Sequence, residues 1–211
     1  MINSNNSVLL VVDVQMDFCP AGNLPVPDGD KVVPVINRLT QVFQRIVATQ
    51  DWHPQDHVSF ASNHPGSNPF DILPENGEGQ ILWPDHCVPG TEGAEFHPDL
   101  DTLAFDLIVR KGTDPQLDSY SAFFENDHKT PTGLHFYLEG LNVKSVYLAG
   151  LALDVCVYYS AMDALQLGYN TVVVEDACRG IDTPPGSLEA RLDEMRNSGA
   201  HIQTAADVEE S

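Results

Sequence analysis

Cys156 is the residue of this chain best placed to do chemistry. It follows the apolar run from Ser145 to Ala149 and lies at the start of an amphipathic segment. If these form a strand and a helix, the thiol meets unpaired backbone N–H groups and the positive end of the helix dipole. Both favour thiolate over thiol, which predicts an activated nucleophile with oxyanion donors nearby. A free cysteine taken alone is more often an inert core residue, so the prediction needs support from other residues.

That support comes from Asp13 and Lys111, each of which ends another apolar run. Ligands of open parallel sheets bind beyond the carboxyl ends of the strands, so we expect both side chains beside Cys156. There the carboxylate could take the thiol proton and return it to a leaving amine, while the ammonium lowers the pKa of the thiol. Backbone amides at Ala152 and Cys156 could hold an oxyanion. These roles predict acyl transfer through a thioester.

A second group of polar residues, Asp51, His53 and His86, could hold a metal ion. Asp-x-His places a carboxylate and an imidazole together on one loop, and His86 from another loop would leave coordination positions open for water or substrate. Taken without the rest of the pattern, these histidines would be read as hydrogen-bonding loop residues. His57 is ambiguous: it is either an extra ligand or, as we favour, a structural or supporting residue.

Three aromatic residues, Phe18, Trp83 and Tyr120, are candidates for the walls of a flat pocket. Each lies close in sequence to one of the polar residues above. An isolated aromatic side chain is usually part of the core, but this proximity favours a pocket that holds a ring.

The fold class follows from the hydrophobic pattern. Apolar runs typical of buried strands alternate with helical periodicity, which indicates an open, mainly parallel sheet between two helical layers, that is, a three-layer α/β/α, Rossmann-like fold. The expected strands are Val8–Val12, Arg45–Thr49, Asp106–Arg110, Ser145–Ala149, Thr171–Glu175 and His201–Thr204, and the expected helices are Val32–Phe43, Thr132–Glu139, Asp154–Leu167 and Pro185–Ser198. The segment from Asp51 to Leu100 is rich in Pro and Gly, and so long an irregular segment predicts a site or a lid.

Composition restricts the classes of partner. The 211 residues fit one domain, residues 1–211. Neither a secretory signal nor a membrane-spanning run is evident, and the four cysteines show no CxxC pairing, so we expect a cytoplasmic protein with free thiols. A net charge of -21 disfavours nucleic acid and anionic membranes as partners. The free edges of the expected sheet are compatible with a homo-oligomer.

Six short motifs together resemble those of a known family. They are DVQMDF at 13–18, TQDWHP at 49–54, WPDHCV at 83–88, KGTD at 111–114, DSYSAF at 118–123 and GLALDVCV at 150–157. In this order and spacing they resemble the nicotinamidases (pyrazinamidases) of the isochorismatase-like cysteine hydrolase family. Two positions depart from the expected pattern: Leu153 stands for the usual threonine and Met16 for a common asparagine.

The resemblance implies roles for the residues named above. Asp13, Lys111 and Cys156 would form the catalytic triad; the metal ligands would be Asp51, His53 and His86. The metal would be divalent, most commonly zinc, with iron or manganese as alternatives, and it would bind the pyridine nitrogen of nicotinamide. Phe18, Trp83 and Tyr120 would contact the ring, and the Leu151–Ala152 bond would be a cis peptide beside the oxyanion hole. The expected reaction is hydrolysis of nicotinamide in NAD salvage, with pyrazinamide as a second expected substrate.

Other functions are compatible with part of this pattern. A related metal-independent cysteine hydrolase would act on another small amide, a carbamoyl or a ureido compound, but such enzymes usually lack the Asp51–His53–His86 set. Enol-ether cleavage of the isochorismatase type does not need the cysteine. A non-catalytic metal- or nucleotide-binding module would need no activated thiol, and no Gly-rich phosphate loop follows any expected strand.

Overall fold

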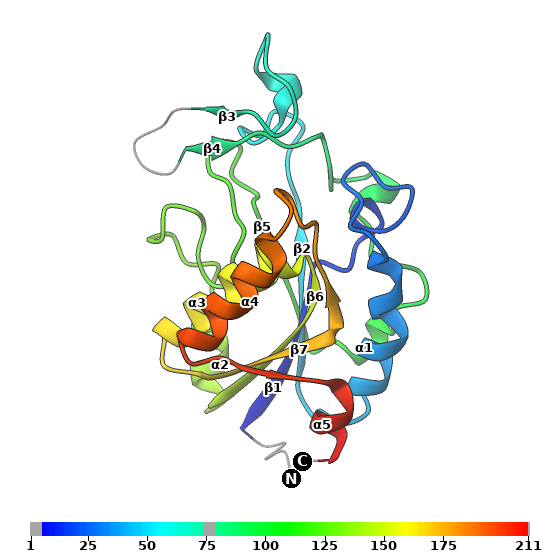
Figure 1. The fold of residues 1–211 in the computed structure, drawn as a ribbon, viewed down its shortest axis with the longest axis vertical. Helices are drawn as coiled ribbons and strands as arrows, with labels where there is room; N and C mark the ends of the chain where they lie inside the picture. Colours follow the sequence, from blue (N-terminus) through cyan, green and yellow to red (C-terminus); the bar gives the residue numbers. More distant parts are fainter. Residues whose placement is uncertain (1–5, 74–78, 211) are drawn as a thin grey trace.

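A computed structural model describes residues 6–73 and 79–210 of the chain and has a six-stranded sheet at its centre (Figure 1). The strand order is β5-β2-β1-β6-β7-β8, and every neighbouring pair is parallel. The strands are β1 (Ser7–Val12), β2 (Ile46–Asp51), β5 (Leu107–Lys111), β6 (Ser145–Leu151), β7 (Asn170–Arg179) and β8 (His201–Gln203). All six predicted strands are present, and the three-layer α/β class is confirmed.

Helices cover both faces of the sheet because successive strand residues point to opposite sides. Val8, Leu10 and Val12 of β1 pack into the core beneath one set of helices, and Leu9 and Val11 pack into the core beneath the other. The first set is α2 (Leu134–Gly140), α3 (Tyr158–Gln166) and α4 (Ser187–Asn197), and the second is α1 (Val33–Leu39) and α5 (Ala205–Glu210) (Figure 1).

The helix expected from Asp154 to Leu167 has a different start. A single π-helical turn, Leu153–Val157, precedes α3. The N–H groups of Val155 and Val157 both donate to the Ala152 carbonyl, at 3.0 and 3.1 Å. Such a turn widens the helix by one residue and is frequent at functional sites. Cys156 therefore lies in an irregular first turn rather than in an ordinary α-helical one.

The segment after β2 is mostly irregular, as expected. It contains two short 3₁₀ turns, Ala61–Asn63 and Glu92–Ala94. It also contains an antiparallel strand pair that was not predicted, β3 (Ile72–Leu73) and β4 (Gln80–Ile81). Figure 1 shows this hairpin beyond the carboxyl ends of the central strands. None of the helices in the described part of the chain has the length and apolar character needed to cross a bilayer.

Candidate active site

The carboxyl ends of four neighbouring strands bring the predicted polar residues together. Asp13 directly follows β1, Asp51 ends β2, Lys111 ends β5, and β6 leads into the turn that carries Cys156. The parallel register pairs Asp51 with Lys111. Strands β1 and β6 approach so closely at this edge that a Cβ on Gly150, whose φ is +125°, would collide with the backbone of β1.

Lys111 is the centre of a buried ion cluster. Its Nζ lies 2.9 Å from Asp13 Oδ2, forms an ion pair with Asp51 Oδ1, and lies 3.6 Å from Cys156 Sγ. The Lys111 side chain is fully buried. Burial by itself would lower the pKa of Lys111, but the two carboxylates outweigh it and hold that pKa well above its ordinary value. The ammonium is therefore charged and balances the nearby carboxylates.

Asp13 has the properties of a proton-transfer group. Burial raises its pKa from 3.8 to about 6, against the opposing charge of Lys111, and Asp51 raises it further. Thr49 Oγ1 donates to Asp13 Oδ1 at 2.6 Å and accepts from the Asp13 N–H at 3.2 Å, which fixes the carboxylate. A base with this pKa is ionised at neutral pH and can still return a proton.

Burial opposes the ionisation of Cys156 that the start of the helix and Lys111 were expected to favour. Burial raises the pKa of Cys156 well above its ordinary value, and Lys111 offsets this only in part. The nearby carboxylate of Asp13 raises the pKa further. The first turn of a helix favours the anion, but here desolvation dominates. Cys156 is therefore a thiol at rest, and its proton has to leave as it attacks.

Two backbone amides next to Cys156 fit an oxyanion. The Leu151–Ala152 peptide is cis, as the family resemblance implied, and Ala152 lines the cavity beside the thiol. In the described part of the chain, the Ala152 N–H has no hydrogen-bond acceptor. The Cys156 amide belongs to the first turn, where amides lack an intrahelical acceptor.

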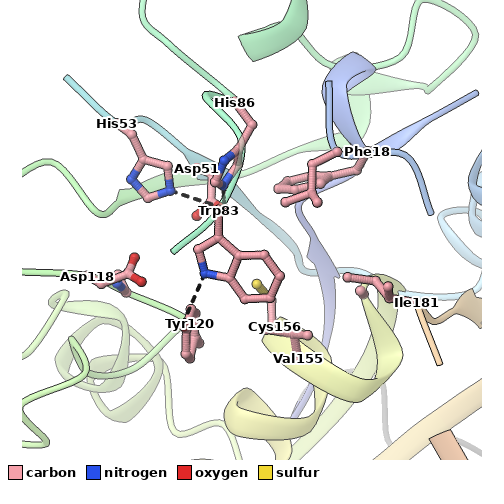
Figure 2. A pocket seen from close by; sticks show the side chains of 13 residues that line it. Phe18, Asp51, His53, Trp83, His86, Asp118, Tyr120, Val155, Cys156 and Ile181 are labelled. Atoms are coloured by element: carbon pink, nitrogen blue, oxygen red, sulfur yellow. Dashed lines mark hydrogen bonds and ion pairs between the residues drawn. The ribbon is translucent and has the colours of Figure 1, made fainter. Parts of the chain in front are cut away.

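Asp51, His53 and His86 form a cluster that could hold a metal ion. Their ligand atoms all lie within 4.8 Å of one another, and His53 Nε2 and His86 Nε2 lie 3.5 and 4.0 Å from Asp51 Oδ2 (Figure 2). His53 Nδ1 bonds the Gly112 carbonyl at 2.9 Å and His86 Nδ1 bonds the Pro84 carbonyl at 2.7 Å. Since a carbonyl only accepts, Nδ1 carries the proton in both rings and Nε2 faces the cluster, as metal-binding histidines require.

The charges of the cluster also suit a cation. Burial would raise the pKa of Asp51, yet Lys111, His53 and His86 hold it well below its ordinary value, so the carboxylate is ionised. Burial and the nearby His53 lower the pKa of His86 to about 4, so that ring is neutral. Burial opposes protonation of His53 as well, but Asp51 raises the pKa of that ring.

His57 supports the cluster from outside. Its Nδ1 bonds Ser59 Oγ at 2.7 Å and its Nε2 bonds the Leu117 carbonyl at 3.3 Å. Its ring packs against the His53 ring with centroids 4.3 Å apart. His57, His53 and Asp118 also lie close enough to form a metal-binding group. Because both ring nitrogens of His57 already have protein partners, the contacts favour the supporting role.

The three predicted aromatic residues line one cavity with the thiol and the metal-binding cluster. This inner cavity has a volume of ≈ 370 Å³, including space open to solvent. Trp83 Nε1 donates to the Tyr120 hydroxyl at 3.1 Å, and the Phe18 ring lies 5.5 Å from the His86 ring. Figure 2 shows Phe18 beside His86, Trp83 above Tyr120, and Cys156 next to the indole in this view. The cavity therefore offers flat apolar walls between a nucleophile and a cation-binding cluster.

Sequence reasoning gave no role to five further residues that line this cavity: Leu24, Asp118, Ser119, Val155 and Ile181. Ile181 comes from the segment after β7, and its N–H donates to Asp154 Oδ1 at 2.9 Å. Asp154 Oδ2 accepts from the Asp182 N–H at 2.8 Å. Asp154 was quoted as part of a motif but given no role. A carboxylate two residues before the nucleophile was the only signal in the sequence that another segment is held here.

Several known proteins of similar sequence are nicotinamidases. The nicotinamidase of Acinetobacter baylyi is 50% identical over 94% of this chain and 92% of its own length. The nicotinamidase of Escherichia coli is 44% identical over 96% of this chain and 97% of its own length.

Solved structures agree with the sequence comparison. The Acinetobacter baumanii nicotinamidase/pyrazinamidase superposes with a TM-score of 0.93 at 50% identity, covering 97% of this chain and 98% of that one. The yeast nicotinamidase bound to the inhibitor nicotinaldehyde gives 0.85 at 33% identity (94% and 99% covered). The Pyrococcus horikoshii pyrazinamidase in complex with zinc gives 0.77 at 38% identity (94% and 99% covered). The isochorismatase domain model matches residues 7–207, so the chain belongs to the isochorismatase family of hydrolases.

Proposed function

We propose that this chain hydrolyses nicotinamide to nicotinate and ammonia through a thioester on Cys156. One observation carries the proposal: a single small cavity is lined by the thiol and by the Asp51–His53–His86 cluster. A flat heteroaromatic amide uses both features, because its carbonyl needs a nucleophile and its ring nitrogen is a ligand for a metal ion. A metal-independent amidase for carbamoyl or ureido compounds would have no use for the cluster.

The proposed metal is a divalent ion held by Asp51, His53 and His86. The donor set fits, since two imidazole Nε2 atoms and one ionised carboxylate meet in a buried site with both Nδ1 atoms anchored on carbonyls. Zinc is the first choice because the related P. horikoshii pyrazinamidase was solved with zinc, while iron and manganese suit the same donors. When bound, the metal supplies a Lewis-acid position for the pyridine nitrogen.

The protein's own residues then carry out acyl transfer. Asp13 takes the proton of the Cys156 thiol as the sulfur attacks the amide carbon, and the amides of Ala152 and Cys156 stabilise the oxyanion. Asp13 returns that proton to the amine as the carbon–nitrogen bond breaks, which releases ammonia and leaves a nicotinoyl thioester. Asp13 next takes a proton from water as the water oxygen attacks the thioester carbon. It gives that proton to the sulfur as the carbon–sulfur bond breaks, which restores the thiol, and the acid product loses its own proton to solvent and leaves as nicotinate. Lys111 keeps Asp13 and Asp51 in place throughout.

The aromatic walls position the ring rather than react with it. Phe18, Trp83 and Tyr120 exclude water and offer flat faces, and the bond from Trp83 to Tyr120 fixes two of the walls. Pyrazinamide, with a second ring nitrogen and the same shape, is the expected second substrate. Nicotinate is a precursor for NAD salvage. The four cysteines are all unpaired, which suits a reducing, cytoplasmic setting for the reaction.

An ammonia-release assay on nicotinamide tests the proposal. We expect turnover by the purified protein, loss of turnover in Cys156→Ala, and loss after treatment with a chelator that is reversed by added zinc. Metal content should fall in His86→Ala but not in Cys156→Ala. Absence of ammonia release from metal-loaded protein, or full activity of Cys156→Ala, would overturn the proposal. Undiminished activity after complete metal removal would instead favour the metal-independent amidase.

A further inference from the structure

A second, larger cavity lies directly against the inner one. Its volume is ≈ 930 Å³, including space open to solvent, compared with ≈ 370 Å³ for the inner cavity on the same measure. Four residues line both cavities: Trp83, Tyr120, Val155 and Ile181. We call them the partition, since they separate the inner cavity from this outer one.

The outer cavity is suited to an apolar, uncharged group. The β3–β4 hairpin and the chain before it contribute Phe70, Ile72 and Ile81 to its lining, and Phe70 and Ile72 are 49% and 61% exposed. Together with Ile81 they give this side of the outer cavity an apolar lining that is open to solvent. The one cation in the lining, Arg191, already pairs with Glu194 at 3.0 Å. An anionic ligand would therefore have to compete with that pair.

The chemistry of the inner cavity decides which part of a substrate reaches the partition. The leaving amine has to receive its proton from Asp13, which is fully buried and lines neither cavity. The amine therefore faces the closed interior and has to be small. In the proposed reaction, the carboxamide carbon lies at Cys156 and the ring nitrogen at the metal-binding cluster. The part of the ring that can face the partition is therefore the edge farthest from both the carboxamide and the ring nitrogen.

We propose that the outer cavity is a subsite for apolar substituents on that ring edge. The substituted carbon is the one meta to both the ring nitrogen and the carboxamide-bearing carbon. The partition side chains Val155 and Ile181 are aliphatic and can change rotamer to let a short alkyl chain pass. The enzyme would then hydrolyse alkyl-substituted heteroaromatic carboxamides by the same acyl transfer, with ammonia still leaving. This inference rests on the proposed function and extends its substrate class.

Three substrates test the subsite on the metal-loaded protein: nicotinamide, a nicotinamide with a propyl group on the meta carbon, and N-propylnicotinamide. We expect kcat/KM for the meta-propyl compound to stay within about tenfold of nicotinamide, because the propyl group leaves water for an apolar cavity. The N-propyl compound should be hydrolysed at least about a hundredfold more slowly, because its leaving group meets the closed interior. If nicotinamide itself is not hydrolysed, the proposed function is wrong. If nicotinamide is hydrolysed but the meta-propyl compound is not, only the proposed subsite is wrong.

A matched pair of variants assigns the effect to the outer cavity. Ile72→Asp puts a charge into the outer lining, and Ile108→Asp puts the same charge on β5, where the isoleucine is 45% exposed and lines neither cavity. Ile72→Asp should raise KM for the meta-propyl compound about fivefold to tenfold and leave nicotinamide unchanged. Ile108→Asp should change neither. Equal effects of the two variants, or an equal effect of Ile72→Asp on both substrates, would refute the subsite.

Discussion

One proton passes between Cys156 and Asp13 during the proposed reaction, and burial determines which of the two groups holds it in the free enzyme. Because the pKa of the thiol is raised well above its ordinary value and that of Asp13 is raised only to about 6, the thiol is protonated and the carboxylate ionised at neutral pH. The free enzyme is competent when Asp13 is ionised. We therefore expect kcat/KM for nicotinamide to rise with pH through about 6 and then to level off. A profile that stays flat down to pH about 5, or one that rises only where an ordinary thiol ionises, would contradict this assignment.

Removing the charge of Lys111 should destabilise the fold as well as abolish activity. Lys111→Met keeps the length of the side chain but leaves Asp13 and Asp51 buried without their counter-ion, which costs about 3–5 kcal/mol of unfolding free energy. Lys31, whose pair with Asp28 is exposed, supplies the control: Lys31→Met should change stability by less than about 1 kcal/mol. Denaturant titration of both variants at neutral pH measures the difference. Equal losses would show that Lys111 does not stabilise the carboxylates.

Asp154 connects the π-helical turn that carries Cys156 to the segment after β7, which lines the inner cavity. Its carboxylate accepts from the N–H groups of Ile181 and Asp182 and from Ser187 Oγ, at 2.9, 2.8 and 3.3 Å. Asp154→Ala leaves these donors without their acceptor, so we expect a loss of about 1–3 kcal/mol and a higher KM for nicotinamide, because Ile181 is no longer held. Asp127→Ala, which removes a carboxylate that caps an exposed turn, is the control for KM. An unchanged KM in Asp154→Ala would remove Asp154 from the support of the cavity.

The sequence predicted the elements that long hydrophobic patterns specify. Buried parallel strands appear as continuous apolar runs, so the ends that place Asp13, Asp51 and Lys111 at one edge could be found within one or two residues. Local patterns too short to carry a period were missed: the two-residue strands β3 and β4, the six-residue α5, and the π-helical turn at Cys156. The strong effect of burial on the pKa of the thiol could not be predicted either, because it depends on how completely the folded protein excludes water.

The whole molecule carries a net charge of -21, yet its proposed substrate is neutral. The neutral nicotinamide is therefore not repelled by the protein as it approaches the site. The anionic nicotinate is repelled by the negative charge of the protein for as long as it stays bound. The chain has only ten Lys and Arg residues against 31 Asp and Glu residues. One of the ten, Lys111, is buried among carboxylates. The charge of the protein thus favours release of the product over its retention.

This asymmetry predicts opposite salt responses of product and substrate. The Debye length falls from about 30 Å at 0.01 M salt to about 10 Å at 0.1 M, so added salt screens the field that repels nicotinate. We expect the inhibition constant of nicotinate to decrease about threefold or more over this range, while the KM of nicotinamide stays constant because the amide has no charge to screen. The two ligands differ in one functional group, which makes each the control for the other. Nicotinate that binds more tightly at low salt would show that the nearby cations, rather than the net charge, govern product release.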